Sequence, residues 1–128
     1  VSLDKQLIDA PLHRYELANG ERRVRVSSEG KESKTQWNVA ERFMHATLVY
    51  ASPLSGRTHQ IRVHGLSIGH PLVGDDKYGH ETEYKGPKPR RLCLHAMRLD
   101  IPGYAPIEAP LPEDMQSIVA QLRAQKKD

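Results

Sequence analysis

The chain has 128 residues, which is enough for one domain or a part of one. Its 38% hydrophobic and 27% charged residues are ordinary for a soluble globular protein, and a formal charge of +3 permits a polyanionic partner without requiring one. The single cysteine, Cys93, excludes an intrachain disulfide and a cysteine-rich zinc site, and the lack of an 18-residue apolar run excludes a membrane-spanning helix.

The first half of the sequence has the pattern of antiparallel strands. Residues 1–10 show no clear period. Further on, the residue types predict four strands, over residues 13–17, 23–27, 35–43 and 47–50. An Asn-Gly pair at positions 19 and 20 indicates a hairpin between the first two, and a short connection indicates another between the last two.

Residues 58–69 fit either a strand, by their alternation, or a helix, by their apolar face. The helix is favoured, with Thr58 as its N-cap and Gly69 ending it before Pro71.

The rest of the chain predicts loops, two short strand regions and a final helix. Residues 72–79 form a loop with two glycines, and the polar residues 80–90 form an exposed loop. A strand is predicted over residues 92–101, a short one around Ile107, and a helix from Pro112 to about Lys126. The predicted class is α+β, a mostly antiparallel mixed sheet with flanking helices.

The densest polar segment lies over the predicted helix and the loop after it. It reads Gly-Arg-Thr-His-Gln-Ile-Arg-Val-His over residues 56–64, Gly-His-Pro over 69–71 and Gly-Asp-x-x-Tyr-Gly over 74–79. Polar groups packed beside isoleucine and valine, and framed by glycines, indicate the wall of a site rather than a solvated face. Together with Leu-Cys-Leu-His-Ala over residues 92–96, these motifs resemble the signature of the RluA-type RNA pseudouridine synthases.

This resemblance implies an enzyme that isomerises uridine to pseudouridine in RNA, with no metal or organic cofactor. The target base is flipped into a pocket, where an aspartate attacks the sugar, attacks the base or abstracts a proton. Residues 29–43 resemble the subgroup that modifies large-subunit ribosomal RNA. The expected partner is therefore ribosomal RNA of the 23S type, in the cytoplasm and away from membranes.

The family's catalytic aspartate lies in a His-Arg-Leu-Asp-x-x-Thr-Ser-Gly motif, which this sequence lacks. The chain also has no initiator methionine. We therefore expect residues 1–128 to be the C-terminal portion of a pseudouridine synthase catalytic domain, inactive alone. A sheet without its upstream strands would leave an apolar face uncovered, so self-association is expected.

Arg62 is the strongest site candidate, because the resemblance makes it the arginine that pairs with the catalytic aspartate. A guanidinium offers two parallel donors that hold a carboxylate ionised and oriented. In this chain Arg62 is expected to lack that partner. Gln60 and His59 are expected to orient neighbouring groups, although His59 and His64 could equally serve structural roles. Five residues apart on a helix, the histidines would point about 140° apart, which argues against a shared metal.

Further residues are candidates for substrate binding. Tyr78 is expected either to shape the pocket for the base or to be an aromatic core residue. One of the two leucines Leu92 and Leu94 is expected to line that pocket, and the alternative for each is an ordinary core position. The remaining candidates are basic residues that could neutralise RNA phosphates, or simply form a solvated face: Arg57, Lys85, Arg90 and Arg91.

Two other functions stay open at this point. One is a non-catalytic RNA-binding module on the same scaffold, which the missing aspartate motif keeps in view. The other is a metal-dependent nuclease that would use Asp75, Asp76 and a histidine, although Gly74 and Tyr78 around the acidic pair favour a turn. No metal site is expected.

Overall fold

The computed structural model describes residues 3–79, 84–100 and 102–126. The chain is α+β, as predicted, and every strand pairing among the described residues is antiparallel. The elements in chain order are β1 (Lys5–Asp9), β2 (Leu12–Glu16), β3 (Arg22–Val26), β4 (Lys34–Arg42), β5 (Thr47–Pro53), α1 (Gln60–Ser67), β6 (Arg98–Leu99), β7 (Ile107–Glu108) and α2 (Glu113–Lys126).

The central sheet has the order β1-β4-β5, with β5 at one edge. The predicted β4–β5 hairpin is confirmed, with a bulge between Val39 and Glu41. Strand β1 was not predicted. It pairs with the first half of β4, and its only buried side chain is that of Ile8, so its sequence carries no alternating pattern to reveal it.

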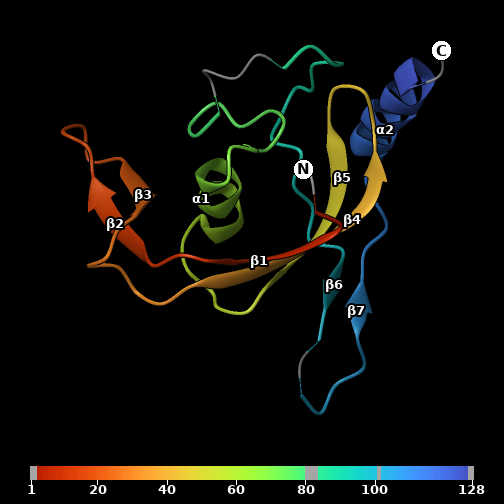
Figure 1. The fold of residues 1–128 in the computed structure, drawn as a ribbon. Helices are drawn as coiled ribbons and strands as arrows, with labels where there is room; N and C mark the ends of the chain where they lie inside the picture. The colour runs from red at the N-terminus through yellow and green to blue at the C-terminus, as the bar shows by residue number, and fades with distance from the viewer. Residues whose placement is uncertain (1–2, 80–83, 101, 127–128) are drawn as a thin grey trace.

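The predicted β2–β3 hairpin is also confirmed, and Gly20 in its turn has φ +86. Helix α1 lies between this hairpin and the central sheet (Figure 1). A buried cluster of Leu12, Val24, Val63 and Tyr78 joins the hairpin to α1 and to the loop after it.

Helix α1 confirms the helical interpretation of its segment, but Thr58 is not its cap. The N-cap residue is His59, which has φ 52 and makes no capping hydrogen bond with its side chain. Gly69, with φ +80, donates its N–H to the carbonyl of Leu66 and ends the helix as expected.

The strand predicted over residues 92–101 is largely wrong, and Ile101 lies outside the described residues. Only Arg98–Leu99 forms a strand, which pairs with Ile107–Glu108 in a hairpin that projects from the body of the chain (Figure 1). A strand requires a neighbour, and residues 92–97 have none along most of their length. Their one backbone bond to the preceding loop runs from Cys93 N–H to the carbonyl of Val73.

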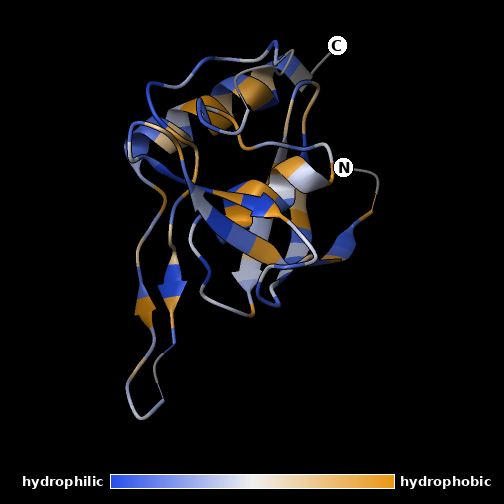
Figure 2. Cartoon of the chain, turned by 90° about the vertical axis from the view of Figure 1, so that its left-hand side faces the viewer, coloured by the Kyte–Doolittle hydropathy of each residue, from blue (hydrophilic) through white to orange (hydrophobic). Residues whose placement is uncertain are grey.

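Helix α2 confirms the predicted final helix and begins just after Pro112. Met115 and Leu122 are its buried side chains, and Figure 2 shows apolar residues recurring along it. Within the described residues, neither helix is long and apolar enough to cross a membrane.

Candidate active site

An ion pair between α1 and the loop that follows it lies at the centre of the candidate site. Arg62 donates from Nε to Asp75 Oδ2 at 2.9 Å and from Nη2 to Asp75 Oδ1 at 2.7 Å. The Asp75 side chain is fully buried, and that of Arg62 is 15% exposed. Arg62 therefore has one carboxylate partner within this chain, although Asp75 does not lie in the motif in which the resemblance places the catalytic aspartate.

The loop is folded around the Asp75 carboxylate. Oδ1 also accepts the backbone N–H groups of Lys77 and Tyr78, each at 3.1 Å. Burial works to raise the pKa of Asp75, but hydrogen bonds from Arg62 and from these two amides outweigh it and hold the pKa below its usual 3.8. The carboxylate is therefore ionised at neutral pH. The predicted turn around the acidic pair is confirmed, since residues 73–74 and 76–78 lie in turns.

Tyr78 and His59 complete the cluster beside this ion pair. The Arg62 guanidinium lies 5.1 Å from the centre of the Tyr78 ring, a cation–π arrangement. The Tyr78 hydroxyl accepts the N–H of Val24 at 3.1 Å and lies 2.7 Å from His59 Nδ1. The arrangement that satisfies all three groups has the hydroxyl donating to an unprotonated Nδ1.

The electrostatics of the cluster agree with that arrangement. Burial and, after it, the positive charge of Arg62 lower the pKa of His59 from 6.5, so its ring is neutral at pH 7. Burial likewise raises the pKa of Tyr78, which keeps its proton. The cluster thus contains one fixed positive and one fixed negative charge, surrounded by neutral donors and acceptors.

Gln60, expected near this centre, lies in a separate buried network. Its Oε1 accepts from Ser55 Oγ at 2.7 Å and from the N–H of Arg57, and its Nε2 donates to the carbonyl of Lys34 and to Thr35 Oγ1. These bonds attach the start of α1 to β4. The structure does not bring Gln60 to the Arg62–Asp75 pair.

His64 continues that network on the far side of α1 from Tyr78. Its Nε2 lies 2.9 Å from the carbonyl of Ala10, which can only accept, so Nε2 carries the proton. Its Nδ1 then accepts from the Thr35 hydroxyl at 2.7 Å. Both ring nitrogens are engaged, which supports the structural role considered for His64. No group of three metal-binding side chains occurs in the described parts of the chain.

The residues expected to bind substrate are dispersed. Lys85 and Arg90 are exposed, and Arg91 pairs with Asp114 at 2.6 Å. Exposed Arg57 donates twice to the carbonyl of Glu32. None of these basic groups contacts the Arg62–Asp75 pair.

A wide apolar groove of about 1610 Å³ extends from α2 and β5 to the loop that carries Asp75. Leu94 lines it, whereas Leu92 does not, and neither is in a strand. Trp37 also lines it, and its Nε1–H is buried without an acceptor among the described residues. Sequence reasoning missed both the groove and the role of Asp75. The acidic turn residue after a helix rich in polar groups was the available signal for Asp75.

The fold of this chain is similar to that of two solved human structures. The human protein RNA pseudouridylate synthase domain containing 1 matches 100% of this chain and 63% of its own, with a TM-score of 0.72 and 29% identity. The human protein RNA pseudouridylate synthase domain containing 4 matches 94% of this chain and 57% of its own, with a TM-score of 0.70 and 25% identity.

Relatives among curated proteins agree. Ribosomal large subunit pseudouridine synthase C of Yersinia pestis is 48% identical over 124 residues, and that of Haemophilus ducreyi is 46% identical over 128 residues. These alignments cover 91% and 94% of this chain, but only 39% and 40% of the two relatives. No protein-family model matches the sequence. Over nearly its whole length the chain is similar to part of ribosomal large subunit pseudouridine synthase C, and it spans about 40% of the length of the curated relatives it matches.

Proposed function

We propose that this chain is part of an enzyme that isomerises uridines to pseudouridine in large-subunit ribosomal RNA, and that Arg62 positions the catalytic aspartate. The observation that carries the proposal is the orientation of the Arg62 guanidinium. Its Nε and Nη2 are held by Asp75, and among the described residues nothing accepts from Nη1. One edge of the fork is thus fixed and the other remains available to a second carboxylate.

Asp75 is not itself suited to be the reactive acid. Its side chain is fully buried and both oxygens are engaged by Arg62. The reactive aspartate is therefore proposed to lie in a segment equivalent to the part of the relatives that this chain does not match. Residues 1–128 are proposed to be a portion of the catalytic domain. The proposal places the reaction in the cytoplasm, since the relatives are bacterial and are named for ribosomal RNA.

Two alternatives differ in their support. Exposed Lys85 and Arg90 are compatible with a module that binds RNA without modifying it. The nuclease has no such support, because Asp75 is committed to Arg62 and Asp76 is exposed, so the two do not form a pair of metal ligands.

The same proposal includes self-association, in which a second copy of the chain covers the apolar groove. It is supported by the apolar residues that line the groove and by the position of β5, whose outer edge has no partner strand among the described residues.

The decisive experiment uses a chimera of this chain and the remaining segments of a related synthase. Residues 1–128 would replace the aligned segment of the Escherichia coli synthase C, which is 45% identical over 126 residues. Tritium release from carbon-5-labelled uridine in ribosomal RNA would then be measured in single turnover. Release by the chimera supports the enzyme. RNA binding by a folded chimera without release would favour the binding module instead.

Variants of the chimera test the role of Arg62. Arg62→Lys keeps the charge but loses the planar fork, so release should fall about 100-fold. Arg22→Lys is the matched control, because the Arg22 side chain is exposed and, among the described residues, its one ion pair is with Glu16 at 3.7 Å. Equal rates for the two variants would remove Arg62 from the proposed role.

A further inference from the structure

Three basic side chains that have no carboxylate partner among the described residues line one pocket. They are Arg14 on β2, Lys31 in the turn before β4, and Arg57 before α1. Of the other arginines of the β2–β3 hairpin, Arg22 pairs with Glu16 and Arg23 with Glu21, whereas Arg25 lies over the ring of Tyr15. Unpaired like charges repel one another, so their gathering in one hollow of about 420 Å³ calls for a negative partner.

The pocket is built by close backbone packing. A Cβ on Gly30 would lie 2.5 Å from the backbone carbon of Leu12, so only glycine lets the turn approach β2 this closely. Two reciprocal backbone bonds of 2.9 Å between Leu12 and Lys31 close the contact. Lys31 is therefore held at the pocket by its main chain, while its ammonium group is free to bind a ligand.

Arg57 is also held in place without being neutralised. Its Nε and Nη2 donate to the carbonyl of Glu32 at 3.1 and 3.0 Å, while the Glu32 carboxylate pairs with Lys34 at 3.2 Å. Within the described residues the guanidinium thus has no carboxylate partner, and its Nη1 makes no hydrogen bond. The Thr58 hydroxyl, which has no partner among the described residues, adds a neutral donor to the same wall.

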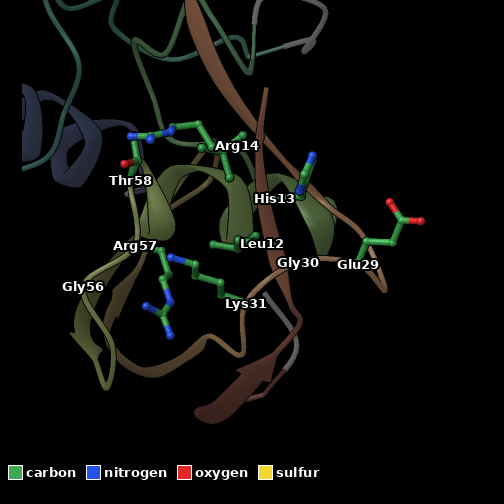
Figure 3. A pocket seen from close by; sticks show the side chains of 10 residues that line it. Leu12, His13, Arg14, Glu29, Gly30, Lys31, Gly56, Arg57 and Thr58 are labelled. Atoms are coloured by element: carbon green, nitrogen blue, oxygen red, sulfur yellow. The ribbon is translucent and has the colours of Figure 1, made fainter. Parts of the chain in front are cut away.

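One acid, Glu29, also lines the pocket. In Figure 3 the Glu29 carboxylate points away on the side opposite Arg57, whereas Lys31 extends toward Arg57 and Arg14 extends toward Thr58. Glu29 therefore does not serve as a counter-ion for the three basic side chains of the pocket.

We propose that this pocket binds a phosphate group of the RNA backbone, held by Arg14, Lys31 and Arg57. The inference rests on the proposed function and extends it to a named contact with the substrate. The pocket shares a wall with the candidate active site, because Val24 lines it and also donates its N–H to Tyr78, and Thr58 directly precedes His59. A phosphate bound here would belong to a nucleotide close to the one that reacts.

The test measures binding by the chain itself, so it does not depend on catalysis. Backbone amide resonances of Gly30, Lys31 and Gly56 would be followed during titration with a short oligouridylate, with inorganic phosphate and with the nucleoside uridine. The proposal expects shifts with the oligouridylate, weaker shifts of the same amides with inorganic phosphate, and none with uridine. Saturation by inorganic phosphate that the oligouridylate cannot displace would overturn the RNA assignment.

Matched variants separate a built site from diffuse charge. The double variant Arg14→Ala with Lys31→Ala should weaken oligouridylate binding about tenfold and reduce the slope of log K against log salt by about 0.7, the value for one phosphate of a single strand. Lys5→Ala removes an exposed charge on β1 outside the pocket and should change affinity less than about twofold. Equal losses per charge removed in the two variants would overturn the proposal.

The two proposals fail in different ways. Tritium release by the chimera together with an unresponsive pocket would overturn only this inference. Pocket binding in a chimera that releases no tritium would support this inference and overturn the enzymatic function.

Discussion

Arg62 and Asp75, thirteen residues apart, are joined by two parallel hydrogen bonds that connect the first turn of α1 to the loop after the helix. The carboxylate also accepts the N–H groups of Lys77 and Tyr78, and the guanidinium lies over the Tyr78 ring. The orientation of Arg62 and the fold of the loop therefore depend on the same carboxylate. This dependence makes Asp75 a positioning residue whose removal has measurable consequences.

Asp75→Asn should destabilise the chain by about 2 to 3 kcal/mol. The substitution removes the negative charge and leaves the largely buried Arg62 cation without compensation. That figure lies at the lower end for a buried pair, because the arginine is 15% exposed. Urea unfolding of the variant measures the loss. Asp76→Asn, at the exposed neighbouring position, should change the free energy of unfolding by less than about 0.5 kcal/mol. Comparable losses for the two variants would mean that the pair contributes little.

The same carboxylate predicts a dependence of stability on acid. Its pKa in the folded chain is lower than the usual 3.8, so its contribution is fully present above 3.8 and is lost as pH falls through the folded value. The difference in unfolding free energy between the chain and Asp75→Asn should therefore shrink below about pH 4. Urea midpoints measured at a series of pH values test this. A difference that stays constant down to about pH 2 would contradict the lowered pKa.

Local patterns in the sequence were sufficient for elements whose partners lie nearby. The Asn-Gly turn predicted the β2–β3 hairpin, and the apolar side of residues 113–126 predicted α2. Strand β1 was not predicted, because it is formed by its pairing with β4 and its own residues have no strand pattern. The opposite error occurred at residues 92–97, where an alternating pattern has no strand to pair with.

The site was predictable in its residues more than in its contacts. The motif identified Arg62, His59 and Tyr78, which the structure brings together. It did not separate Gln60, which is two positions from Arg62 and so faces another side of α1, toward β4. Spacing along a helix gives the direction of a side chain, but only the packing of α1 on β4 shows what lies there.

The buried network of Thr35 gives a prediction that is independent of Arg62. Thr35 is completely buried, and its hydroxyl accepts from Gln60 Nε2 while donating to His64 Nδ1. Thr35→Val keeps the shape but leaves a buried acceptor on His64 unsatisfied, which should cost about 1 to 3 kcal/mol in thermal or urea unfolding. Thr47→Val on β5 is the control, because the Thr47 hydroxyl has no hydrogen bond among the described residues. Equal effects would show that the network is energetically neutral.

The apolar groove leads to the last prediction, which concerns association. Each Å² of apolar surface that two such faces remove from water contributes about 25 cal/mol to their association. We expect sedimentation velocity to show an average mass that rises with concentration. Val49→Lys, in the groove on the edge strand β5, should shift the chain toward monomer. Leu54→Lys removes an exposed leucine outside the groove and should leave the association unchanged. A single monomeric species at every concentration would contradict the prediction, since a second copy would then not cover the groove.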